Sequence, residues 1–180
     1  MRIISGKYKG RIITPPRNFK ARPTTDRARE SLFNILNNEF DFESLAILDL
    51  FSGTGSIGFE FHSRGAEYVE MVEKNYVHFQ HLQNVKHEFH MENVRIIKGD
   101  VFLYLRKEHR EFDLVFADPP FDLKEFAQVP ELVLAAGLLK KNGLFILEHP
   151  SIHVFTAHPH FAQHRKYGGV NFTLFTKSSY

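Results

Sequence analysis

Cysteine is absent from the 180 residues of this chain. The protein therefore has no disulfide framework, no thiolate zinc site and no cysteine nucleophile. A chain without cysteine suits a reducing compartment, and we expect this protein in the cytoplasm.

Long apolar runs are also missing from the sequence. Residues 1–7 (MRIISGK) become polar within a few positions and lack the apolar stretch of a secretory signal. No segment approaches the roughly 20 apolar residues of a transmembrane helix. The sequence therefore predicts a protein that does not enter a membrane.

Patterns typical of metal binding are weak. The chain has 11 histidines, and His158, His160 and His164 have workable ligand spacing. There is no cysteine to complete such a set and no His-Glu-x-x-His arrangement on a helix. Because histidine has many neutral uses, we interpret these residues as solvated or packed side chains and predict no metal site.

The chain contains enough apolar material for one domain. Its length and its hydrophobic content of 43%, with 19 Phe, are sufficient for a substantial core. No internal repeat or low-complexity linker divides it. We expect one compact unit, a monomer, made of a basic N-terminal arm over residues 1–22 and a larger domain over residues 23–180.

Positive charge is concentrated near the N-terminus. The net charge is +2, but residues 1–30 hold nine Lys or Arg against two acids, a net of +7, which leaves −5 for the rest of the chain. The basic residues alternate with apolar and glycine positions and form no low-complexity run. Segregated charge of this kind favours a nucleic acid as the partner over a solvated tail.

Apolar runs of strand length alternate with stretches of helix length. The runs cover residues 45–51, 68–72, 94–97, 112–117 and 144–147. This alternation predicts a parallel sheet covered on both faces. At the C-terminus, Phe161–Lys166 and Val170–Thr176 flank a Tyr-Gly-Gly turn, so the sheet is expected to end in an antiparallel hairpin.

The N-terminal region is expected to form a hairpin followed by a helix. Residues 1–14 contain two short β-prone runs with glycines at the turns. Thr24 or Thr25 can cap the helix that follows. This helix is expected to bury Leu32 and Leu36 and to expose Arg22, Arg27 and Arg29.

A glycine loop indicates a nucleotide-like ligand. Gly53 to Gly58 (GTGSIG) follows an apolar run, and Glu73 after the next run is placed to hold ribose hydroxyls. NAD enzymes share this pattern, but Asp49 suits the ammonium of S-adenosylmethionine better than a pyrophosphate, and Asp100 can accept from an adenine amino group. The residues predicted to bind this cofactor are Asp49, Phe51, Gly53, Thr54, Gly55, Glu73, Lys74, Asp100 and Val101.

The tetrad Asp118-Pro119-Pro120-Phe121 follows the fourth apolar run, at the same edge of the sheet. Its adjacent prolines fix the backbone and remove two N–H donors, so the turn offers acceptors only. The Asp118 carboxylate and the Pro119 carbonyl can each accept one N–H of a planar amino group while Phe121 stacks on the ring. We predict that these four residues are catalytic and position an exocyclic amine for methylation.

These motifs carry a family resemblance. The segment DLFSGTGSIG (49–58), with Glu73, Asp100 and DPPF (118–121), resembles the motif set of class I amino-methyltransferases. More specific are MRIISGKYKG and RPTTDRARESLFNIL near the N-terminus, SRGA after the glycine loop, Glu148-His149 and the terminal hairpin. Together they resemble the bacterial 16S ribosomal RNA guanine-N2 methyltransferase family of the RsmD type, over nearly the whole chain.

The resemblance implies a fold, a cofactor and a substrate. The fold would be an α/β, Rossmann-like class I methyltransferase, with a mostly parallel seven-stranded sheet, an antiparallel C-terminal hairpin and a small N-terminal β-hairpin extension. The methyl donor would be S-adenosylmethionine, and the substrate one guanine in small-subunit ribosomal RNA or in an assembly particle. The residues expected to contact RNA are Arg2, Lys7, Lys9, Arg11, Arg22, Arg27, Arg165, Lys166 and Tyr167.

Several alternatives stay open on the residues alone. The same turn can hold the N6 amine of adenine, so adenine-N6 methylation of RNA or DNA is an alternative within the enzyme class. A NAD-dependent oxidoreductase would use the glycine loop but leaves the Asp-Pro-Pro-Phe turn and the basic arm unexplained. A non-catalytic RNA-binding module would explain the arm alone. For either methyltransferase, the target base is expected to be flipped out or to lie in a loop.

Overall fold

The computed structural model describes residues 1–15, 19, 25–107 and 110–177. Within these residues, seven strands form one sheet in the order β3-β2-β1-β4-β5-β7-β6. The strands are β1 (Ala46–Leu50), β2 (Tyr68–Glu73), β3 (Val94–Lys98), β4 (Phe112–Ala117), β5 (Leu139–His149), β6 (Phe161–Tyr167) and β7 (Val170–Thr176).

The sheet has a parallel part and an antiparallel part. Strands β1 to β5 are parallel to one another, whereas β7 runs antiparallel to β5 and β6 antiparallel to β7. The predicted mostly parallel sheet with an antiparallel C-terminal hairpin is therefore confirmed. Every residue of β1 is buried, as expected for a central strand with both faces covered.

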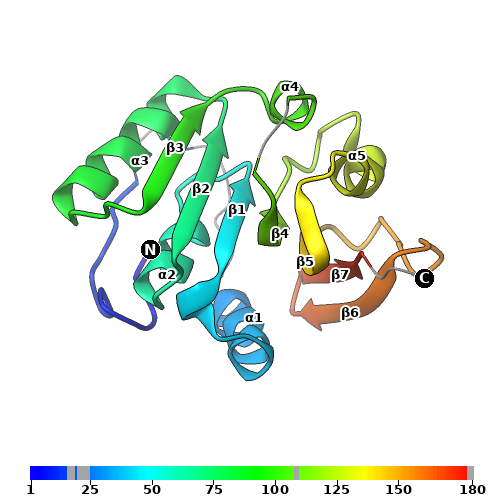
Figure 1. Ribbon diagram of the computed structural model, residues 1–180, viewed down its shortest axis with the longest axis horizontal. Helices are drawn as coiled ribbons and strands as arrows, with labels where there is room; N and C mark the ends of the chain where they lie inside the picture. The colour runs from blue at the N-terminus through cyan, green and yellow to red at the C-terminus, as the bar shows by residue number, and fades with distance from the viewer. Residues whose placement is uncertain (16–18, 20–24, 108–109, 178–180) are drawn as a thin grey trace.

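Helices cover both faces of this sheet (Figure 1). Helices α1, α2 and α3 pack on one face, and α4 and α5, with the short turn η2, pack on the other. No helix in the described ranges is long and apolar enough to cross a membrane. The helical elements are α1 (Asp26–Glu39), η1 (Phe42–Ser44), α2 (Gly58–Ser63), α3 (Tyr76–Glu88), α4 (Val101–Leu105), η2 (Phe126–Gln128) and α5 (Val129–Ala135).

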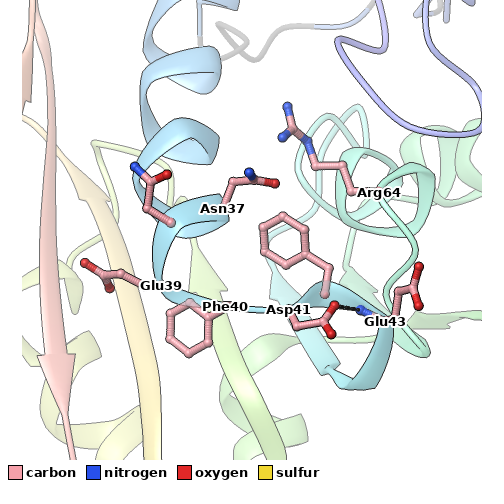
Figure 2. A pocket seen from close by; sticks show the side chains of 8 residues that line it. Asn37, Glu39, Phe40, Asp41, Glu43 and Arg64 are labelled. Atoms are coloured by element: carbon pink, nitrogen blue, oxygen red, sulfur yellow. Dashed lines mark hydrogen bonds between the residues drawn. The ribbon is translucent and has the colours of Figure 1, made fainter.

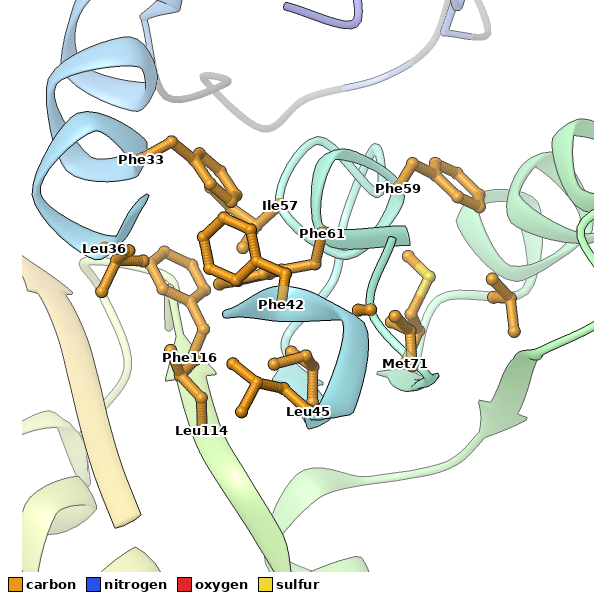
Figure 3. Close-up of a cluster of buried hydrophobic side chains, with 14 of the residues drawn as sticks. Phe33, Leu36, Phe42, Leu45, Ile57, Phe59, Phe61, Met71, Leu114 and Phe116 are labelled. Carbon is orange, nitrogen blue, oxygen red and sulfur yellow. The ribbon is translucent and has the colours of Figure 1, made fainter. Parts of the chain in front are cut away.

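Phenylalanines fill the core between α1, α2 and the sheet (Figure 3). Phe33, Phe42 and Phe61 meet edge to face, with ring centroids 4.6 to 6.3 Å apart. Edge-to-face pairs add about 0.5–1.5 kcal/mol each beyond the burial of their area. The predicted burial of Leu32 and Leu36 is also confirmed, since they are 1% and 0% exposed.

The N-terminal segment pairs with itself across its two ends. Arg2 and Ile12 form an antiparallel bridge, the Ile3 N–H donates to the Arg11 carbonyl at 3.0 Å, and Met1 and Ile13 each donate to the other's carbonyl at 2.8 Å. Ile3 and Ile13 are also buried in the core. The expected hairpin is therefore present as a short antiparallel pairing that packs on the domain, and the boundary expected at residues 22–23 lies outside the described residues.

Helix α2 holds this segment in place. The carboxylate of Glu60 accepts the N–H groups of Ile4 and Ser5, at 2.8 and 3.0 Å. The Lys7 N–H donates to the Ser63 carbonyl at 2.7 Å. Because Glu60 is fully buried, these bonds form away from solvent and anchor the segment firmly.

Helix α1 begins where the sequence predicts. Thr25 caps it, since its side chain accepts the N–H of Ala28. The expectation that Arg29 is exposed was wrong, because its side chain is 0% exposed. Its guanidinium donates to the Arg2 carbonyl at 2.5 Å and pairs with Asp26 at 2.9 Å, so it links the helix start to the N-terminal segment. Burial lowers the pKa of Arg29, and the nearby acids oppose this change.

Candidate functional site

A cavity of about 1120 Å³ lies at the carboxyl edge of the five parallel strands. In open parallel sheets this edge is where ligands bind. The wall is formed by the residues that follow β1, β2, β3 and β4, by Glu148 near the end of β5, by the start of α1 and by the β6–β7 turn. Of the predicted site residues, those in the wall are Arg27, Phe51, Gly53, Thr54, Glu73, Lys74, Asp100, Val101, Asp118, Pro119, Pro120, Phe121, Lys166 and Tyr167.

The glycine loop turns sharply at the end of β1. Phe51, Gly53 and Gly55 have positive φ angles of 60°, 53° and 77°. A Cβ on Gly55 would lie 2.4 Å from the ring of Phe59, so this position requires glycine for space as well as for its backbone angle. The tight turn places the Gly53 and Thr54 segment against the cavity.

Asp49 supports the loop from behind. It was expected to contact the cofactor, but it and Gly55 are not among the residues that line the cavity. Its carboxylate accepts the Gly58 N–H at 3.0 Å and is 2% exposed. Burial raises the pKa of Asp49 to about 7.

Glu73 connects β2 to the glycine loop. One of its oxygens accepts the Gly53 N–H at 2.9 Å, and the other accepts the Asn75 N–H at 2.6 Å. A carboxylate has about four lone-pair positions, so both oxygens can accept further bonds from a ligand in the cavity. This fits the predicted contact with ribose hydroxyls.

Asp100 has three hydrogen-bond partners at the cavity wall. One oxygen caps α4 by accepting the N–H groups of Phe102 and Leu103, at 2.9 and 3.2 Å. The other accepts from the Lys74 ammonium at 2.9 Å, and this bond is the main reason why the pKa of Asp100 is lowered. Asp100 therefore stays ionised, and it joins Lys74 to the start of α4 in the cavity wall.

The Asp-Pro-Pro-Phe turn presents unused acceptors. Within the described residues, neither the Asp118 carboxylate nor the Pro119 carbonyl accepts a hydrogen bond, whereas the Pro120 carbonyl accepts the Leu123 N–H at 2.9 Å. Burial raises the pKa of Asp118 well above its usual range, and the nearby carboxylates of Glu148 and Asp49 raise it further. A donor or a cation that comes close therefore favours the ionised form of Asp118.

Phe121 stands beside these acceptors as an exposed ring. It is 53% exposed and meets Phe126 edge to face, with centroids 6.3 Å apart. Phe126 in turn stacks on His153 at 4.4 Å. An exposed ring held by a buried aromatic neighbour is suited to stacking on a base.

The residues predicted to contact RNA fall into separate groups. Arg27, Lys166 and Tyr167 lie at the cavity. Arg2, Lys7, Lys9, Arg11 and Arg165 lie outside its wall, and Arg22 lies outside the described residues. On the N-terminal segment, Arg11 covers the ring of Phe89 at 4.8 Å and the Lys7 ammonium lies over Tyr8 at 5.3 Å.

Sequence reasoning missed several wall residues. Phe19, whose ring stacks on His78 at 4.0 Å, carried no signal because neither residue belongs to a motif. The glycines of the β6–β7 turn were interpreted only as a hairpin signal. Glu148 did carry a signal, since it follows the apolar run 144–147 as Asp118 follows the run 112–117, but it was noted only within the family resemblance.

A second, smaller pocket lies between the end of α1, η1 and Arg64 (Figure 2). Its volume is about 490 Å³. Three acids line it, and Asp41 already accepts the Glu43 N–H at 3.2 Å. The described residues contain no group of three or more side chains placed to hold a metal ion. The carboxyl-edge cavity is therefore the candidate active site.

Comparisons with known proteins agree with this geometry. A family described as "Conserved hypothetical protein 95" matches residues 1–176. The ribosomal RNA small subunit methyltransferase D of Buchnera aphidicola subsp. Baizongia pistaciae is 34% identical over 148 residues, covering 82% of this chain and 75% of that protein. The solved structure of the putative methyltransferase yhhF from Escherichia coli is 28% identical with a TM-score of 0.87, covering 100% and 99% of the two chains.

A more distant structure shares the fold alone. A putative methyltransferase solved in complex with S-adenosylhomocysteine is 18% identical with a TM-score of 0.66, covering 82% of this chain and 49% of that one. The predicted Rossmann-like class I methyltransferase fold is confirmed, and the methyltransferase interpretation holds over the oxidoreductase. This chain belongs to the family of RsmD-type ribosomal RNA methyltransferases.

Proposed function

We propose that the protein transfers a methyl group from S-adenosylmethionine to the exocyclic N2 amine of a guanine in 16S ribosomal RNA. One observation carries this proposal. The unused acceptors of Asp118 and Pro119, with the exposed ring of Phe121, line the same cavity as the glycine loop. The name of the Buchnera relative supports ribosomal RNA of the small subunit as the substrate.

The cavity fits both reactants. Binding pockets for a single small ligand are usually about 300–1000 Å³, so about 1120 Å³ accommodates a cofactor together with one flipped base. When bound, S-adenosylmethionine supplies an electrophilic methyl group on a cationic sulfur. Glu73 and Asp100 would hold its ribose and adenine portions. At Gly53 and Thr54 the backbone of the glycine loop can approach the cofactor closely.

The turn residues orient the amine. The N2 lone pair of guanine is delocalised into the ring, so the free amine is a poor nucleophile. Acceptance of its two N–H groups by Asp118 and Pro119 favours a tetrahedral nitrogen whose lone pair faces the methyl group. As the new N–C bond forms, the S–C bond breaks, and the surplus amine proton leaves to water. Positioning is therefore the main contribution of this chain to the reaction.

The wall beyond the turn suits a base flipped from RNA. Phe121 and Tyr167 are aromatic residues of the wall that can stack on the base. Arg27 and Lys166 also line the cavity and can pair with the flanking phosphates. The basic residues of the N-terminal segment lie outside the wall, and we propose that they contact RNA beyond the target nucleotide.

Label transfer tests this function. Methyl-labelled S-adenosylmethionine is incubated with the protein and either naked 16S RNA or small subunits, both from cells that lack their own guanine-N2 activity. We expect label in N2-methylguanosine, and the better substrate shows whether the enzyme acts before or during assembly. Label in N6-methyladenosine would overturn the base assignment. No label, although S-adenosylhomocysteine raises the melting temperature, would overturn the proposed activity.

A further inference from the structure

A second carboxylate lies beside the catalytic turn. In the β4–β5 register Ala117 pairs with Leu147, so Asp118, which directly follows β4, comes next to Glu148 of β5. Adjacent strands are about 4.8 Å apart, and paired residues direct their side chains to the same face of the sheet. Both residues line the cavity, and Glu148 is only 4% exposed.

The pKa of Asp118 reflects this closeness. The charge of Glu148 is the second-largest cause, after burial, of the raised pKa of Asp118. On its other side Glu148 pairs with Phe172 of β7, whose side chain is fully buried. Glu148 therefore lies between the catalytic turn and the β6–β7 hairpin, at the wall of the proposed base site.

Guanine and adenine differ at the atom next to the reacting amine. In guanine, N1 carries a hydrogen and lies beside the N2 amine, whereas N1 of adenine is an acceptor beside the N6 amine. An ionised carboxylate can only accept hydrogen bonds. A carboxylate that faces this position therefore completes a bond with guanine and meets a lone pair in adenine.

Building on the proposed function, we propose that Glu148 selects guanine by accepting the N1–H of the base whose N2 amine is held by Asp118 and Pro119. This role is compatible with other partners of Glu148, because a carboxylate offers about four lone-pair positions. Burial strengthens the selection, since a base without N1–H leaves one desolvated acceptor position of the carboxylate facing a lone pair. Asp118 and Pro119 hold either amine, whereas Glu148 distinguishes the two rings.

The test changes the base and the side chain together. The target guanosine, located by the labelling experiment, is replaced in synthetic RNA by the riboside of 2-aminopurine, which keeps the C2 amine but has an acceptor at N1. We expect wild-type kcat/KM to be about 10- to 100-fold higher for guanine, the range for one hydrogen bond to a charged group. In Glu148→Gln the amide can donate to N1, so this preference should shrink below about threefold or reverse.

Control measurements separate selection from general damage. Glu125→Gln removes an exposed carboxylate outside the cavity wall and should keep the wild-type preference. Glu148→Gln should bind S-adenosylhomocysteine with an unchanged thermal shift. A preference unchanged in Glu148→Gln, including an equal loss on both bases, would overturn the role of Glu148. Absence of labelled N2-methylguanosine with the wild-type protein would instead overturn the proposed function itself.

Discussion

Three carboxyl groups lie close together at the ends of three adjacent strands. Asp49, Asp118 and Glu148 come from β1, β4 and β5, and burial of Asp49 and Asp118 raises the pKa of each. Such a cluster disfavours a second or third negative charge until a cation or a donor arrives. In the proposed reaction, the positive charge of the sulfonium and the N–H groups of the target amine would stabilise the negative charge of this cluster.

Removal of the Asp118 carboxylate tests its role in transfer. In Asp118→Ala the N2 amine loses one acceptor, and we expect kcat to fall on the order of 100- to 1000-fold, as for other preorganised hydrogen-bonding groups. Binding of S-adenosylhomocysteine, followed by thermal shift, should stay at the wild-type level. Asp118→Asn keeps an oxygen acceptor and should retain more activity than the alanine variant. Loss of cofactor affinity in Asp118→Ala would place this residue in the cofactor site.

The raised pKa of Asp118 predicts how the rate depends on pH. Protonated Asp118 is the weaker acceptor, so the single-turnover rate should rise with pH as the proton leaves. Because the Glu148 charge raises the pKa of Asp118, Glu148→Gln should move the midpoint of the profile to lower pH. Single-turnover rates across the pH range measure both midpoints. A midpoint that stays fixed would show that the two carboxyl groups are not coupled.

Asp49 predicts a pH dependence of folding. Its pKa is about 7 in the folded protein, against an ordinary value of 3.8. Between these values the folded form binds a proton that the unfolded chain has released, so the free energy of unfolding falls as pH rises toward and through 7. Asp49→Asn should flatten this fall, measured as urea midpoints at pH 5 and pH 8. The exposed control Glu92→Gln should follow the wild-type curve.

At the scale of elements, the strands could be predicted because burial on both faces produces apolar runs. Strand β4 was predicted with its observed bounds, but β5 begins at Leu139, five residues before the predicted run. Residues 140–142, near the start of β5, are polar. The pairing of β5 with β4 shifts register between Phe112 and Leu114, opposite this polar stretch. Apolar periodicity does not reveal a strand start that is exposed to solvent.

The N-terminal segment shows what its local pattern could predict and what it could not. Its two β-prone runs pair through backbone hydrogen bonds, as predicted, while Ile3 and Ile13 are buried in the core of the domain. An isolated two-stranded hairpin is marginal in water, so packing on the core stabilises this pairing. Burial of Arg29 has the same origin, because the backbone carbonyl that it binds belongs to this segment. Contacts between distant parts of the sequence leave no periodic signal.

Gly6 predicts how tightly this segment packs on α2. A Cβ at Gly6 would lie 1.7 Å from the Ser63 carbonyl oxygen, whereas a Cβ at Gly10 would meet nothing within 4 Å. Both glycines have positive φ, at 79° and 84°, so alanine strains the backbone by about 1–2 kcal/mol at either position. Gly6→Ala should therefore lower the unfolding free energy more than Gly10→Ala in chemical denaturation. Equal losses would show that the segment does not contact α2 closely.

Over the whole molecule, the position of the cavity could be predicted from sequence but its full wall could not. The residues that follow parallel strands meet at one edge, so the glycine loop, Asp100 and the Asp-Pro-Pro-Phe turn were expected together. The β6–β7 turn reaches the same cavity only because β7 pairs with β5, a long-range pairing. Asp49 was expected at the same cavity, but it lies within β1 and its side chain bonds the Gly58 N–H behind the glycine loop.

The charge distribution of the whole molecule leads to the last prediction. Lys7, Lys9 and Arg11 belong to the docked N-terminal segment, outside the cavity wall, so they can bind phosphates without touching the target base. Replacing all three with glutamine keeps their apolar stems and removes three charges. Each phosphate contact contributes about 0.7–0.9 to the slope of log affinity against log salt, so the slope should become shallower by about 2–3. Fluorescence anisotropy with 16S RNA fragments at several salt concentrations measures it.

The matched control removes charge elsewhere. Lys107 and Lys141 are exposed and lie outside the cavity wall, and their replacement by glutamine should change the salt slope little. Thermal shift with S-adenosylhomocysteine should be the same in both variants, because neither change reaches the cofactor residues. If the triple variant kept the wild-type slope, the N-terminal segment would not contact RNA, and Arg27 and Lys166 at the cavity would have to supply the phosphate contacts.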